Sequence, residues 1–367
     1  MRRAIILAFL VTAIVSMAIA CGRRQAAPVS PTSATPGTGD AAADGTTLKA
    51  SAPTLQSPIN GVQAAAFQPV TLLLANSTTP FATGAPLSYR FELTNAAGAV
   101  VDNALVAGGA ATTGRTVAPA LLQDGALYRW RARAEFQDAF GPWSAQASFL
   151  APINDGFIRS DALYDPLVNG KTVGEIHGNV TFVPNVGLRI NDNTSWVSYQ
   201  LPQTLTGGEF SILITGIEHQ SKGLKTKIMS MSSGYSNMTT NPRRFTIEKR
   251  GAAEPGSIAW RIITSGGQIE TIGAARRFVK FDPALTYFWR ATWGGGNYLL
   301  TIDEGGVGGA RVYQRGSPYA GVYDPNPHVV FLGSPDSTSG PDAQSVPGMI
   351  LRHVWVSAQP RPDYANR

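Results

Sequence analysis

Cysteine and charge are scarce in this chain of 367 residues. Cys21 is its only cysteine, so no disulfide can form within the chain and its folded parts depend on burial of side chains. Charged residues make up 15% of the sequence, whereas 39 glycines and 25 prolines divide the apolar residues into short runs. Such a composition is typical of an all-β protein with many turns. Once the first residues are set aside, the length suits two domains.

Signatures of several protein classes are also missing. No glycine-rich phosphate loop occurs, and the export signal described below argues against a nucleic-acid partner. The four histidines are scattered and form no cluster with metal-ligand spacing, so no metal or cofactor is expected. Calcium is the alternative, on loop oxygens such as those of Asp303-Glu304 or of Asp336 and Asp342, although no recognisable calcium loop is present.

An apolar run over residues 4–20 follows the basic pair Arg2 and Arg3 and ends at Cys21. This order is that of a secretory signal, and the run is too short for a comfortable membrane span. The string Ala18-Ile19-Ala20-Cys21 resembles the lipobox of bacterial lipoproteins, which implies removal of residues 1–20 and lipidation of Cys21. A plain secretory signal with an incidental cysteine is the alternative. We expect the protein in the cell envelope, anchored to the outer membrane or cell surface through Cys21.

Residues 21–52 are rich in Ala, Pro, Thr, Ser and Gly and contain almost nothing large enough to pack. A segment of this composition cannot offset the entropy lost on ordering, so it is predicted to be a flexible tether.

Residues 53–152 contain short strand candidates and turn signals that predict a small sandwich. The opening Pro53-x-Leu55-x-Ser57-Pro58, the string from Leu122 to Tyr128 and Gly141-Pro142-Trp143-Ser144 resemble a fibronectin type III domain. In such domains the tyrosine hydroxyl binds back to the loop backbone, a role that falls to Tyr128. Alternation places Trp130 on one strand face and Arg131 and Arg133 on the other. We interpret Trp130 and Trp143 as core residues, and the arginine face as solvated.

Residues 155–358 contain many more strand candidates and no helix-length amphipathic segment, which predicts a larger antiparallel jelly-roll sandwich. Three stretches, in order, resemble a concanavalin A-like, or laminin-G-like, lectin and glucanase domain: Gly187 to Ile190 before Trp196, Gly208 to Ile212, and Tyr287 to Trp293 followed by Tyr298 to Asp303. The resemblance implies carbohydrate binding. Residues 359–367 form a tail.

The aromatic hairpin within this second segment is the candidate sugar site. On its first strand Tyr287, Trp289 and Trp293 share one face, while Phe288 and Arg290 share the other. One face must be core; if the other lines a concave sheet, a ring beside a charged side chain can stack on a sugar. The predicted carbohydrate-binding residues are therefore Trp196, Trp289, Arg290, Trp293 and Asp303, with core packing as the alternative for each aromatic.

Catalysis is less well supported by the sequence. Glycoside hydrolysis needs two carboxylates at a set separation, and the Glu-x-Asp-x-x-Glu motif of glucanases of similar fold is absent. The nearest pair, Glu209 and Glu218, is predicted to lie on opposite strand faces. Glu175-Ile176-His177, and Tyr287-Phe288 with Gly296-Asn297-Tyr298, faintly resemble elements of polysaccharide lyases, but Glu175 replaces a neutral amide and Trp289 a lysine. No catalytic residue is assigned, and a protein that is not an enzyme is favoured.

The leading hypothesis is a membrane-anchored lipoprotein that binds a glycan or polysaccharide through a concanavalin A-like domain, held out by a fibronectin-like spacer. A structural or adhesive surface protein that binds another protein is the alternative, and a polysaccharide lyase is the third. Basic residues such as Lys225, Lys227, Arg243 and Arg244 are suited to an acidic polysaccharide or to a solvated outer face.

Overall fold

The computed structural model describes residues 47–79, 86–219, 225–233, 243–250, 254–270, 277–335 and 343–366. The signal, Cys21 and the tether up to residue 46 lie outside these ranges, as do Asp336 and Asp342. The chain is all-β, as predicted, with short 3-10 turns at η1 (Pro119–Leu121) and η3 (Asp363–Asn366). Within the described ranges, no helix is both long enough and apolar enough to cross a bilayer.

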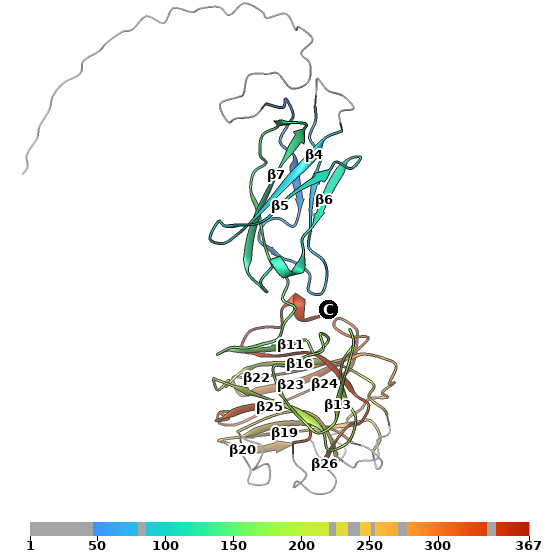
Figure 1. Ribbon diagram of the computed structural model, residues 1–367. Coiled ribbons are helices and arrows are strands. Elements are labelled where there is room, and N and C mark those ends of the chain that lie inside the picture. The colour runs from blue at the N-terminus through green and yellow to red at the C-terminus, as the bar shows by residue number, and fades with distance from the viewer. Residues whose placement is uncertain are drawn as a thin grey trace, which may run out of the picture.

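The first sandwich pairs a three-stranded sheet with a larger one (Figure 1). Side chains such as Leu72, Phe91, Trp130 and Phe149 fill the space between them. The first sheet contains β1 (Thr54–Ser57), β3 (Thr71–Ala75) and β6 (Thr112–Thr116), and the second runs in the order β2 (Val62–Gln63), β9 (Ala147–Leu150), β7 (Leu127–Phe136), β4 (Ser88–Asn95) and β5 (Val100–Ala107), with β8 (Ala139–Phe140) beside β7.

The tyrosine expected to close a loop of this sandwich does so. The Tyr128 hydroxyl accepts a hydrogen bond from the Gln123 backbone N–H at 2.9 Å and donates one to the Leu121 carbonyl at 3.2 Å. Trp130 is fully buried and donates its indole N–H to the Pro58 carbonyl at 2.8 Å. The tyrosine corner and the core position of Trp130 are therefore confirmed.

Trp143 does not lie in the core as predicted. Its half-buried ring is stacked between the guanidinium groups of Arg131 and Arg133, whose Cζ atoms lie 4.4 and 4.7 Å from the ring centre. The ring therefore covers the arginine face of β7, because cations are attracted to the negative face of an aromatic ring.

The second sandwich consists of two large sheets (Figure 1). The near sheet, on the side of the first sandwich, runs in the order β10 (Phe157–Ile158), β11 (Ala162–Asp165), β27 (Ile350–Ser357), β16 (Gly208–Thr215), β22 (Tyr287–Gly294), β23 (Asn297–Glu304) and β24 (Ala310–Pro318), with β13 (Val180–Val183) and β14 (Gly187–Ile190) branching from β27. The far sheet runs in the order β12 (Glu175–His177), β15 (Trp196–Leu201), β25 (His328–Gly333), β17 (Lys225–Ser232), β18 (Arg244–Arg250), β19 (Ser257–Thr264) and β20 (Gly267–Glu270), with β21 (Arg277–Phe278) beside β19 and β26 (Ala343–Ser345) beside β17.

Alternation along these strands builds one large core between the two sheets. On β16, Phe210, Ile212 and Ile214 point inward, and on β17 Met229 and Met231 do the same. The β22–β23 hairpin holds the near sheet in register, with Gly294 opposite Asn297 across a turn of Gly295 and Gly296. These two glycines have φ values of 55° and 75°, a conformation that suits the twist of a two-residue hairpin turn.

A short connection between the sandwiches is hydrogen-bonded to both. A carboxylate oxygen of Asp124 in the first sandwich accepts the backbone N–H groups of Asn154 and Asp155 at 2.9 and 2.6 Å. The ring of Phe67 lies 5.7 Å from that of His353 on β27. Ile153 joins a small apolar cluster with residues of β11, β27 and the C-terminal tail. The connection is therefore structured rather than a free linker.

Candidate ligand-binding face

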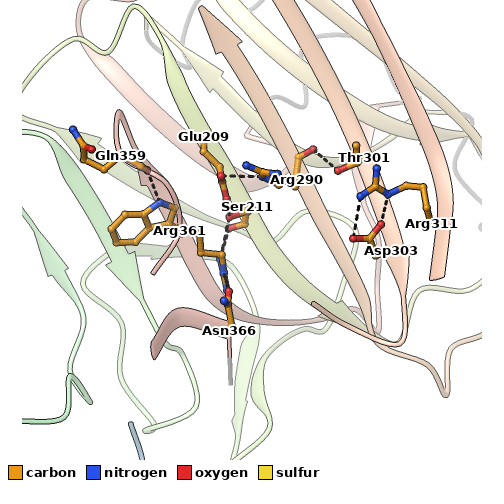
Figure 2. A network of polar contacts seen from close by, with 10 residues as sticks. Glu209, Ser211, Arg290, Thr301, Asp303, Arg311, Gln359, Arg361 and Asn366 are labelled. Atoms are coloured by element: carbon orange, nitrogen blue, oxygen red, sulfur yellow. Dashed lines mark hydrogen bonds and ion pairs between the residues drawn. The ribbon is translucent and has the colours of Figure 1, made fainter. Parts of the chain in front are cut away.

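The outward face of the near sheet carries a polar network whose charged groups have protein partners. Figure 2 shows Arg290 of β22 beside Glu209 of β16, with 2.9 Å between guanidinium and carboxylate. The Ser211 hydroxyl donates to the same carboxylate at 2.8 Å. On β23, the carboxylate of Asp303 accepts from the guanidinium of Arg311 on the edge strand β24.

The C-terminal tail closes one end of this network (Figure 2). Arg361 donates to the Ser211 hydroxyl at 3.1 Å, to the Asn366 side chain at 2.8 Å and to the Ala365 carbonyl. Burial lowers the pKa of Arg361 to about 10, so the guanidinium stays charged at neutral pH. The tail is therefore an integral part of the near sheet's outer face.

The predicted sugar-binding residues are not brought together by the fold. Trp289 and Trp293 are 0% and 5% exposed and belong to the core cluster, so neither ring can stack on a ligand, and the structure corrects that prediction. Arg290 and Asp303 lie on the outward face of the near sheet. There Arg290 forms an ion pair with Glu209, and Asp303 forms one with Arg311. Trp196 lies on the other sheet. The predictions for Trp289 and Trp293 were wrong for one reason. The face of β22 that carries Tyr287, Trp289 and Trp293 points into the core.

The outward face of the far sheet carries a row of side chains in cross-strand register. Ser198 of β15 pairs with Phe331 of β25, which pairs with Ser230 of β17, followed by Thr246 of β18 and Arg261 of β19. The chain neighbours of each belong to the core cluster, so alternation directs these five side chains away from the core. We call them the far-sheet row.

Several polar atoms on this face are buried and lack a hydrogen-bond partner among the residues that the structure describes. They are the Ser230 hydroxyl, the Thr246 hydroxyl, the Arg250 Nε and the indole nitrogen of Trp196. An unsatisfied buried donor or acceptor costs about 1–3 kcal/mol, and native structures contain few of them. Four of them lie on one face of one sheet, and the same condition holds for the Tyr298 hydroxyl in the core and for Arg352 Nε on the near sheet.

Trp196 and His177 form one end of this face. Their rings are stacked with centroids 4.6 Å apart and an interplanar angle of 13°. His177 Nε2 lies 3.0 Å from the Ser198 hydroxyl and 3.7 Å from a carboxylate oxygen of Glu175. Strand pairing explains the cluster, because Glu175 lies opposite Ser198 and His177 opposite Trp196.

Basic residues dominate the charge of the rest of the face. Lys227, Arg244 and Arg250 project outward beside the far-sheet row, and Arg261 belongs to it. Glu248 is the acidic side chain among them, and its carboxylate lies 3.5 Å from the Arg250 guanidinium. Lys227 and Arg244 are buried, at 3% and 6% exposure, so they are not the freely solvated residues that one interpretation of the sequence predicted.

The described residues do not form a lyase site or a metal-binding site. Tyr287 and Tyr298, the aromatic part of the lyase resemblance, point into the core, whereas His177 lies on the outward face of the far sheet. The described ranges hold no group of three His, Cys, Asp or Glu side chains that could bind a metal. Asp303, one of the calcium candidates, is engaged by Arg311.

Sequence reasoning identified Trp196 but missed the hydroxyl-bearing members of the row. The available signal was the alternation in residues 225–232, KTKIMSMS, where methionines and serines take turns. The methionines are core, so Ser230 had to face outward, and the same argument applies to Thr246 between Phe245 and Ile247.

No protein-family model matches the chain, and no curated protein matches it. Solved structures that match include a native glycosidic hydrolase, at 11% identity and a TM-score of 0.37, covering 56% of this chain and 100% of that one. LamAcat from Zobellia galactanivorans matches at 13% identity and a TM-score of 0.28, over 55% of this chain and 77% of that one. The FN1-FN3 domains of chicken CNTN1 match at 8% identity and a TM-score of 0.24, over 75% and 69%. Similarities this low carry no argument about function.

Proposed function

We propose that this protein binds a glycan or polysaccharide through the outward face of the far sheet. The proposal rests on four buried polar atoms that have no partner in the described part of the chain, one of them in the indole of Trp196, which is stacked on His177. Sugars present hydroxyl groups that both donate and accept hydrogen bonds, together with apolar ring faces. An aromatic platform with a few fixed polar groups is the combination that such a ligand requires.

Binding without cleavage of the polymer backbone is part of the proposal. Of the carboxylates described on this face, Glu175 belongs to β12 and Glu248 to β18, four strand positions away in the sheet order. At about 4.8 Å per strand spacing, that is roughly 19 Å. Glycosidases place their two carboxyl groups about 5–9.5 Å apart, so this pair cannot serve.

The first sandwich acts as a spacer in this proposal. The tyrosine corner at Tyr128 supports a fibronectin type III-like domain, and the two hydrogen bonds to Asp124 hold the connection that follows. We further propose that Cys21 is lipidated and anchors the protein in the cell envelope, on the strength of the lipobox-like string before it. Cys21→Ala should then abolish incorporation of a labelled fatty acid and release the protein from membranes; full retention of the label would contradict the anchor.

The binding proposal is tested by electrophoresis of the folded chain through gels that contain neutral or acidic polysaccharides. Trp196→Ala should weaken retardation about tenfold, since an aromatic contact is worth about 0.5–1.5 kcal/mol and the variant also removes an indole N–H. Trp143→Ala is the matched control, because it removes a half-buried tryptophan from the first sandwich. Absence of retardation by every polysaccharide, or an equal effect of the two substitutions, would overturn the proposal.

A further inference from the structure

Ser198 lies where a nucleophile would lie. Its hydroxyl is 3.0 Å from His177 Nε2, within the 2.6–3.2 Å range that joins a nucleophile to its base. The residue is 5% exposed and occupies the end of the far-sheet row. A serine in such a contact can lose its proton to the imidazole as it attacks an electrophile.

The imidazole of His177 is held in position by its neighbours. The indole of Trp196 stacks on it and fixes the plane of the ring. A carboxylate oxygen of the exposed Glu175 lies 3.7 Å from Nε2. Glu175 approaches the same nitrogen as Ser198, so it differs from the third member of a serine-protease triad; Trp196 supplies the orientation instead.

A hydrogen-bond donor also lies near Ser198 and His177. The indole nitrogen of Trp196 is buried and has no partner within the described ranges. Trp196 and Ser198 are two residues apart on the same strand face, so their side chains rise from points about 7 Å apart. An N–H in that place can stabilise an oxyanion that develops on a substrate carbonyl bound between them.

We propose that Ser198 and His177 form a nucleophile–base pair that hydrolyses ester bonds, with acyl groups carried on sugar hydroxyls as the substrate class. The sugar part of this inference rests on the proposed function. The Ser198 oxygen attacks the ester carbonyl carbon and its proton passes to His177 Nε2. The bond from the carbonyl carbon to the sugar oxygen then breaks, and His177 returns the proton to the sugar hydroxyl. Water next attacks the acyl-serine through His177, releasing the carboxylic acid and restoring Ser198.

Hydrolysis of nitrophenyl acetate by the full chain tests the pair. Ser198→Ala and His177→Gln should each lower kcat/KM by about 10²-fold or more, the range for a lost acid–base partner. Trp196→Phe keeps an aromatic ring over His177 but lacks the N–H, so it should lower kcat while leaving KM nearly unchanged. A fluorophosphonate probe should label Ser198, as located by peptide mass spectrometry. Wild-type rates in Ser198→Ala, or labelling elsewhere, would overturn the inference.

Two variants separate this inference from the proposed function. Ser230 lies on the same face, two strands away, and its hydroxyl has no partner among the described residues, so Ser230→Ala should lose polysaccharide affinity several-fold. Trp143→Ala, in the first sandwich, is the control that should keep nitrophenyl acetate hydrolysis. Polysaccharide binding by a wild-type chain without esterase activity refutes the inference and leaves the proposed function standing. Esterase activity without binding of any polysaccharide supports the pair and refutes the proposed function.

Discussion

The two outward faces of the second sandwich differ in how far their polar side chains are paired. On the near sheet, Glu209 pairs with Arg290 and Asp303 with Arg311, Arg361 of the tail completes the network, and Arg352 Nε is the exception. On the far sheet, four buried hydroxyl and N–H groups have no partner among the described residues.

A paired polar network stabilises the surface that it covers, whereas a buried polar group without a partner reduces stability. On this ground we propose the far sheet as the ligand-binding face and the near sheet as the structural one.

Tryptophan substitution should separate the two sheets most strongly. Trp289→Ala removes a fully buried ring from the near sheet's inner face and should lower the free energy of unfolding by about 3–5 kcal/mol. Trp196→Ala should lower it much less, because that side chain is half-buried and projects from the outward face. Chemical denaturation of both variants measures the difference. Equal losses of stability would place Trp196 in the core as well.

Two buried histidines, His328 and His353, should make the stability of the folded chain depend on pH. Burial lowers the pKa of His328 to about 4 and that of His353 to about 3, the latter assisted by the charges of Arg361 and Arg352. In the unfolded chain both pKa values lie near 6.5, so the unfolded state binds more protons at intermediate pH. Their stabilising contribution is full above pH 6.5 and falls as the pH drops toward the folded values, by about 2 kcal/mol per histidine at pH 5.

Thermal unfolding between pH 7.5 and 4.5 measures this loss. His353→Asn should flatten the pH dependence, and asparagine tolerates the left-handed backbone at this position, where φ is 51°. Ser230→Ala, on the far sheet, removes no titratable group; it is the control and should leave the slope close to that of the wild type. A slope unchanged in His353→Asn would contradict the burial of a neutral imidazole at the junction.

Arg361→Ala should give the smallest of these effects. The variant removes hydrogen bonds to Ser211, Ala365 and Asn366 and should reduce the free energy of unfolding by about 1–2 kcal/mol, with polysaccharide affinity unchanged. Arg361→Lys keeps the charge but cannot reproduce the planar fork, so it should be only a partial rescue. A large loss of ligand affinity in either variant would show that the near sheet takes part in binding.

Much of the fold could be predicted from the sequence because strand alternation is a local property. The alternating strand that holds Trp130, Arg131 and Arg133 and the two strands of the aromatic hairpin were expected where they occur. Strands β5 and β24 were missed, since both lie at sheet edges and mix polar with apolar residues on each face. The role of Tyr128 was predictable because its loop motif is also local.

The candidate site was much harder to predict. Alternation on β22 defined two faces but could not say which one the partner sheet would cover, so Trp289 and Arg290 were grouped as candidates on opposite faces. Ser198, Ser230 and Thr246 come from three strands far apart in the chain, and a single hydroxyl on a strand gives no signal by itself. Their significance lies in the register and in the absence of protein partners for two of them, which only the folded chain shows.

Backbone hydrogen exchange of the full chain, with and without a polysaccharide that retards it, shows which sheet binds the ligand. Binding through the far sheet should slow exchange in β12, β15, β17 and β18 and leave β16, β22 and β23 of the near sheet unchanged. Protection confined to the near sheet, or to the first sandwich, would contradict it.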